Sequence, residues 1–136
     1  MLKLIIGLKG SGKTKQLIEL ANKAVETSPG NVVCVEKSNK LIFDVNHKVR
    51  LVDTEAYNVS GAAELYGLVS GILATNYDVK DLFIDSALRI CGDDKEAWTT
   101  FTAKLDALCA KYEVSCVCTS SIDQADLPAE LEKYVF

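Results

Sequence analysis

The sequence predicts an α/β fold in which strands and helices alternate along one domain, residues 1–136. Four apolar, β-branched runs predict buried strands, at residues 2–6, 31–36, 79–85 and 114–119. Between them, apolar residues recur at helical spacing in residues 13–25, in residues 62–74 and in a helix of about 18 residues that contains Trp98 and Tyr112. Such alternation is typical of a mainly parallel sheet covered by helices, because parallel strands need a crossover that returns the chain to the same edge.

One further segment predicts an addition at the edge of that sheet. Residues 41–45 and 49–52 are rich in apolar and β-branched residues and flank a polar turn, which indicates a hairpin or a strand pair. Asp93 and Asp94 are expected to cap the helix that follows them. Residues 128–134 are expected to form a short helix.

Composition and charge exclude several classes of protein. A chain of 136 residues with 49% hydrophobic and 25% charged residues can bury one core but not two. A net charge of -4 does not favour a nucleic-acid partner, which needs clustered Lys and Arg. No apolar run reaches the roughly 18 residues of a membrane span, and there is no export leader, so we expect a cytoplasmic protein without a membrane partner. The five cysteines include no C-x-x-C pair, which disfavours a zinc site and suits buried thiols in a reducing compartment.

One segment carries a specific motif. Residues 7–14 read Gly-Leu-Lys-Gly-Ser-Gly-Lys-Thr and match the P-loop pattern Gly-x-x-x-x-Gly-Lys-[Ser/Thr] at every fixed position. Glycines let backbone N–H groups crowd around phosphate oxygens, and the helix that follows adds the partial positive charge of its N-terminus. We therefore expect the chain to bind a nucleoside triphosphate, ATP or GTP, together with Mg²⁺. The residues expected to hold the nucleotide are Gly7, Leu8, Lys9, Gly10, Ser11, Gly12, Lys13 and Thr14.

Side chains with charge or hydroxyl groups complete the expected site. Lys13 should place its charge at the β- and γ-phosphates, and Thr14 should supply a hydroxyl to Mg²⁺. Residues 81–85, Asp-Leu-Phe-Ile-Asp, put an acid at the carboxyl end of a predicted strand, as a Walker B element does. Asp85 is thus the second expected magnesium ligand, with a turn or helix cap as the alternative role.

On these two motifs the chain resembles a minimal P-loop NTPase of the RecA-like branch. In that branch a further strand lies between the P-loop strand and the Walker B strand. The resemblance implies a three-layer P-loop NTPase fold with sheet order 1-4-3-2, the four predicted strands being numbered along the chain. It also implies a polar residue at the end of the fourth strand that senses the γ-phosphate, at Thr119, Ser120 or Ser121.

The resemblance also bears on the residues that would act in hydrolysis. Many members place a carboxylate directly after the Walker B aspartate to orient the attacking water, and this chain has Ser86 there. RecA itself and the pilus and type II secretion motors carry a glutamate at the end of the second strand, where this chain has Glu36. The resemblance therefore implies Glu36 as the base, against an ordinary glutamate at a strand end. Arg89 is the candidate to contact the phosphates in cis or in trans, against a solvated loop arginine.

Three functions stay open on this basis. The first is Mg²⁺-dependent binding of a nucleoside triphosphate with slow or partner-stimulated hydrolysis. The second is a phosphotransferase resembling the thymidine kinase group, although the chain lacks the paired cysteines of that group's zinc-bound lasso. The third is a nucleotide-sensing module that does not hydrolyse, which Ser86 favours. A homo-oligomer or a protein partner is expected for a domain with no added substrate module.

Overall fold

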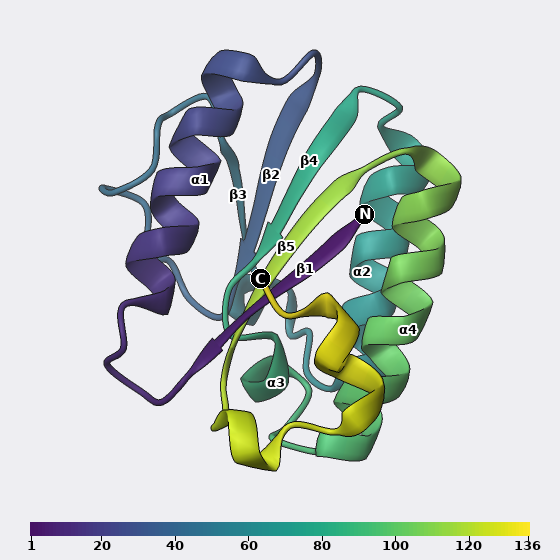
Figure 1. Ribbon diagram of the computed structural model, residues 1–136. Helices are drawn as coiled ribbons and strands as arrows, with labels where there is room; N and C mark the ends of the chain where they lie inside the picture. Colours follow the sequence, from purple (N-terminus) through teal and green to yellow (C-terminus); the bar gives the residue numbers. More distant parts are fainter.

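The computed structural model describes residues 1–136, and a five-stranded sheet lies at its centre (Figure 1). All neighbouring strands are parallel, in the order β1-β5-β4-β2-β3. The strands are β1 (Leu2–Gly7), β2 (Asn31–Glu36), β3 (Arg50–Asp53), β4 (Val79–Ile84) and β5 (Ser115–Ser121). The helices are α1 (Lys13–Thr27), α2 (Ala62–Thr75), α3 (Ala87–Ile90) and α4 (Lys95–Tyr112), with 3-10 turns at Glu55–Tyr57, Gln124–Asp126 and Ala129–Tyr134. The α/β prediction is thereby confirmed, as are the four strands and three long helices at the predicted places.

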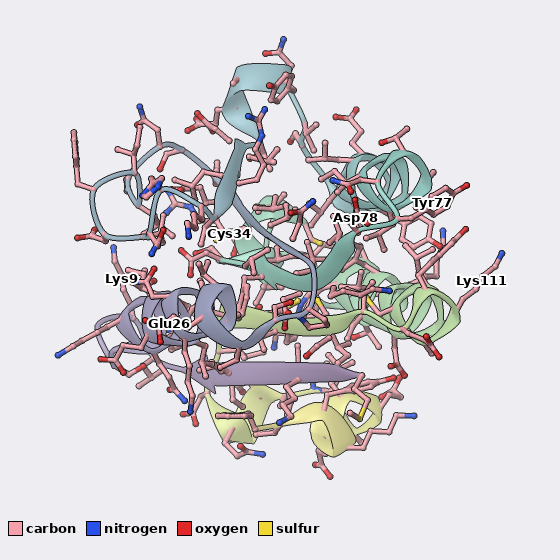
Figure 2. All side chains as sticks on the ribbon, turned by 90° about the horizontal axis from the view of Figure 1, so that it is seen from above. Lys9, Glu26, Cys34, Tyr77, Asp78 and Lys111 are labelled. Carbon is pink, nitrogen blue, oxygen red and sulfur yellow. The ribbon has the colours of Figure 1, made fainter.

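Helices cover both faces of the sheet. Helix α1 lies on one face, and α2 and α4 lie on the other (Figure 1). Figure 2 shows Glu26 of α1 and Lys111 of α4 on opposite sides of the sheet. The central strands supply buried residues to both sides by simple alternation: on β4, Leu82 and Ile84 join the core beneath α2 and α4, whereas Phe83 joins the core beneath α1.

The end of the chain covers the outer edge of β1. Val135 forms a parallel bridge with Leu4, and the backbone N–H of Phe136 donates to the carbonyl of Leu4 at 2.8 Å. The expected short helix forms as the 3-10 turn Ala129–Tyr134, and its Leu131 is buried. The edge of the sheet at β1 is therefore partly covered and hydrogen-bonded by the end of the chain.

The predicted hairpin is wrong. Residues 41–45 form hydrogen-bonded turns, with the N–H groups of Asp44 and Val45 donating to the carbonyl of Leu41. Only the second half forms a strand, β3, and it runs parallel to β2 rather than antiparallel to a hairpin partner. The physical reason is packing, because Leu41 and Val45 are four residues apart and both are buried against the α1 side of the core. Asn22 of α1 holds this segment by accepting from the N–H of Asn46 and donating to the carbonyl of Asp44.

Smaller expectations also have outcomes. Asp94 caps α4, its carboxylate accepting from the N–H of Ala97 at 3.1 Å. Asp93 does not cap a helix, and it sits before that cap with a left-handed backbone, φ 57. The five cysteines are all free and buried, which agrees with the expectation for Cys34, Cys109, Cys116 and Cys118 and adds Cys91. No helix combines the length and the apolar character that crossing a membrane requires.

Candidate functional site

The carboxyl ends of the central strands open into one cleft of about 750 Å³. The chain reaches this cleft after β1, after β2, after β4 and at the end of β5, because parallel strands end at the same edge of a sheet. The predicted site residues that line it are Lys9, Gly10, Gly12, Lys13, Thr14, Glu36, Asp85, Arg89 and Thr119. Gly7, Leu8 and Ser11 belong to the same loop but do not line the cleft.

The loop between β1 and α1 has the backbone that its glycines allow. Gly10 and Gly12 have φ values of 85 and 89, in the left-handed region where a side chain is strained. Gly12 is the residue before α1, and no side chain caps that helix. The first N–H groups of α1 are thus left without a side-chain acceptor at the edge of the cleft, an arrangement that suits an anion.

Lys13 lies inside this loop rather than in open solvent. Its side chain is buried, and its Nζ donates to the carbonyl of Leu8 at 2.9 Å and to the Ser11 hydroxyl at 3.5 Å. The ammonium group is therefore held by the loop that precedes α1. This ammonium group and the first N–H groups of α1 give this corner of the cleft a positive potential.

The carboxylate of Asp85, which follows β4, faces the start of α1. The hydroxyl of Thr14 donates to Asp85 at 3.2 Å to Oδ1 and 3.4 Å to Oδ2. Asp85 comes directly after β4, and its backbone N–H still donates to the carbonyl of Val35 on β2 at 2.8 Å. The sheet ladder thus extends to Asp85.

The end of β5 holds the turn that follows Asp85. Thr119 donates to Asp85 Oδ1 at 2.7 Å and accepts from the N–H of Ser86 at 2.8 Å. Ser86 has a left-handed backbone, with φ 60 and ψ 46, so the turn is one that residues with a Cβ rarely adopt. Ser120 accepts from the N–H of Leu88 at 3.2 Å. The polar residues at the end of β5 therefore shape the turn between β4 and α3, a relationship that the sequence did not reveal.

Glu36 lies at the carboxyl end of β2 and is only 3% exposed. One oxygen, Oε1, accepts from the N–H of Leu41 at 3.3 Å, whereas Oε2 is buried without a partner. Burial raises the pKa of the Glu36 carboxyl, and the charges of Asp85 and Asp53 act in the same direction. The backbone N–H groups of Leu41 and Lys40 oppose that rise. A buried carboxylate oxygen with no partner is a position where a donor would be stabilised.

Cations from other elements also border the cleft. Arg89 of α3 is exposed and lines it, as do Lys37 and Lys40 from the segment after β2. Neither lysine was predicted from the sequence as a site residue. Their position just after a predicted strand could have indicated them, because the segments that follow parallel strands meet at one edge.

Thr14 and Asp85 present oxygen ligands of the kind that Mg²⁺ prefers. No group of three His, Cys, Asp or Glu side chains is arranged to hold a metal ion. Mg²⁺ does not need such a group, because it keeps several waters and is bound through one or two carboxylates and substrate phosphates. The hydroxyl and carboxylate, 3.2 Å apart beside the start of α1, fit that mode.

No protein-family model matches this chain, and no curated protein matches its sequence. The functional assignment therefore depends on the geometry of the cleft.

Proposed function

We propose that the chain is a P-loop NTPase that binds a nucleoside triphosphate with Mg²⁺ in this cleft and hydrolyses it slowly or when a partner stimulates it. The observation that carries the proposal is the hydrogen bond between Thr14 and Asp85. These residues are separated by 71 positions in the sequence, yet they meet where the loop that matches the P-loop pattern leads into α1. A glycine-rich turn that binds no ligand would not require Thr14 and Asp85 to lie together.

The sheet order supports a RecA-like arrangement. β5 lies between β1, which leads into the glycine loop, and β4, which leads to Asp85. The four strands expected from the sequence occur in the order β1-β5-β4-β2, and β3 extends the sheet beyond β2. Helices on both faces complete three layers (Figure 1).

The phosphates would bind between the N–H groups at the N-terminus of α1 and the ammonium group of Lys13. The N–H groups of the loop and helix would donate to the phosphate oxygens, and Lys13 would exchange the carbonyl of Leu8 for phosphate oxygens. Mg²⁺, held by Thr14 and Asp85, would supply charge neutralisation for the β- and γ-phosphate oxygens.

Glu36 is the group that would act on the attacking water. Its Oε2 has no partner in the fold, so a water molecule could donate to it without displacing a protein contact. A raised pKa makes this carboxylate a stronger base than an exposed glutamate. Arg89 reaches the same cleft and would add positive charge on the side of α3.

A thermal shift experiment tests the binding step. The melting temperature would be measured with ATP, GTP and ADP, with and without Mg²⁺, because a ligand that binds the folded state raises it. We expect a Mg²⁺-dependent rise that Lys13→Ala abolishes and that Lys23→Ala, an exposed lysine on the same helix outside the cleft lining, preserves. A rise that survives Lys13→Ala would overturn the assignment of the site.

An assay of phosphate release separates hydrolysis from phosphotransfer and from nucleotide sensing. Release from ATP that requires Mg²⁺ and Glu36 supports hydrolysis. Transfer of phosphate to an added nucleoside would identify a phosphotransferase instead. Binding without release, even with high protein concentration to favour self-association, would favour a nucleotide sensor.

A further inference from the structure

The lining of the cleft is polar to an unusual degree for a small-molecule site. Only three of its 20 residues are hydrophobic, and none is aromatic. The hydrophobic ones are Ile18, Leu41 and Leu88. Sites that recognise an organic ring are mainly apolar or aromatic, with a few polar groups that set its orientation. The lining therefore offers a nucleobase neither a flat platform nor an apolar slot.

Positive charge, by contrast, enters the cleft from three separate parts of the chain. Lys9, Lys13 and Lys15 come from the glycine loop and α1, Lys37 and Lys40 from the segment after β2, and Arg89 from α3. Figure 2 shows Lys9 on the side of the sheet along which the segment after β2 runs. The six cations outnumber the four carboxylates of the lining, in a chain whose net charge is -4.

The aromatic residue nearest in sequence to the lining does not complete a base pocket. Phe43 lies between the lining residues Leu41 and Asp44, yet it is 94% exposed and is not part of the lining. The turn at 41–45 buries Leu41 and Val45 and turns Phe43 outward. Phe43 therefore provides a control for base stacking, because it is the aromatic side chain that would contact a base if it turned toward the cleft.

We infer that the cleft recognises the polyphosphate chain and leaves the base unread, so its ligands are nucleoside triphosphates of any base and inorganic tripolyphosphate. The inference rests on the proposed function, since it assigns the phosphates to the same loop. Charge-assisted contacts from these three parts of the chain would favour phosphate oxygens. Discrimination between bases would need hydrogen-bonding groups arranged to fit one base and to remain unpaired with another.

The experiment is calorimetric titration of the full chain with ATP, GTP, CTP, UTP and tripolyphosphate, each with Mg²⁺. We expect the dissociation constants of the four nucleotides to agree within about threefold and that of tripolyphosphate to lie within about tenfold of them. A preference of more than about tenfold for one nucleotide would overturn the inference, because a base-reading site discriminates on that scale or above. Failure of tripolyphosphate to bind would overturn it as well.

Three variants locate the contacts. The double variant Lys37→Ala with Lys40→Ala should weaken ATP and tripolyphosphate by the same factor and make binding less sensitive to salt, whereas Lys23→Ala should change neither. Phe43→Ala should leave the ratio of the two affinities unchanged. A loss confined to ATP in Phe43→Ala would show that the base stacks there and would overturn the inference.

The outcomes separate this inference from the proposed function. Suppose that Lys13→Ala abolishes binding of every ligand, and that the native chain strongly prefers one nucleotide. The triphosphate site then stands, and only the indifference to the base fails. If Lys13→Ala binds all ligands normally, or if the native chain binds none, the triphosphate site itself is wrong and the inference falls with it.

Discussion

Thr119 donates its hydroxyl hydrogen to Asp85 Oδ1 at 2.7 Å while its oxygen accepts from the N–H of Ser86 at 2.8 Å. One buried hydroxyl thereby orients the carboxylate proposed to hold Mg²⁺ and also the strained turn that begins α3. Thr119, Ser120 and Ser121 were the candidates from the sequence for the residue that senses the γ-phosphate. The contacts of Thr119 give it a second role, which is to position Asp85.

Thr119→Val should separate that positioning role from simple burial. Valine keeps the shape but removes both hydrogen bonds, and it leaves the N–H of Ser86 without an acceptor. We expect a loss of about 1–3 kcal/mol in the free energy of unfolding, measured by urea denaturation. Thr119→Ser keeps the hydroxyl and should retain most of that stability. A larger loss in Thr119→Ser than in Thr119→Val would show that packing of the methyl group, and not the hydroxyl, carries the stability.

Asp85→Asn should remove the Mg²⁺ dependence of nucleotide binding more than binding itself. The amide keeps the size of the side chain but loses the negative charge that attracts the ion. Titration with ATP at increasing Mg²⁺ would measure this. Asp81→Asn is the matched control, because Asp81 lies near the start of β4, away from the cleft lining. A similar change in both variants would argue against a specific role for Asp85.

Glu36→Gln should preserve nucleotide affinity and reduce the rate of phosphate release. Loss of a positioned general base typically costs about 10²–10⁴-fold in rate. Single-turnover release of phosphate, with binding measured in parallel, gives the two quantities. Undiminished release in the variant would remove Glu36 from the mechanism.

The same substitution predicts a pH effect on stability. Burial raises the pKa of Glu36 above its ordinary value of 4.5, so the folded state binds a proton more tightly than the unfolded state. The stability that the protonated carboxyl contributes is therefore fully present below pH 4.5, and it is lost as the pH rises through the pKa of the folded state. The native chain should lose stability relative to Glu36→Gln over that window. Urea denaturation of both proteins from acid to neutral pH would test this, and a constant difference would contradict the pKa rise.

Two glycine substitutions should act in opposite directions. Gly12→Ala should cost about 1–2 kcal/mol, because Gly12 has φ 89 and the added Cβ strains the backbone although no atom lies within 4 Å of it. Gly67→Ala lies inside α2 with no positive φ and no neighbour within 4 Å of its Cβ, and it should gain about 0.5–1 kcal/mol. Thermal or urea unfolding would measure both. Destabilisation by Gly67→Ala would contradict the helical geometry assigned there.

The elements that could be predicted from the sequence are those with a local cause. Each of β1, β2, β4 and β5 contains an uninterrupted run of three or four apolar residues that is buried or nearly so, as is typical of parallel strands covered on both faces. The glycine loop is likewise a local feature, because its conformation depends on residues that tolerate a positive φ. The position of Glu36 at a strand end followed from the same reasoning.

Sequence by itself therefore determined the alternation of strands and helices, the loop motif and the polar residues at the strand ends. Tertiary structure decided what those residues touch. Leu41 and Val45 form turns because α1 offers them a buried surface, a competition that β-propensity does not describe. Thr119 meets Asp85 across 34 residues, and Lys37 and Lys40 join Lys13 in one cleft, only because parallel pairing brings all strand ends to one edge. Such contacts depend on the pairing of distant segments, which no local pattern contains.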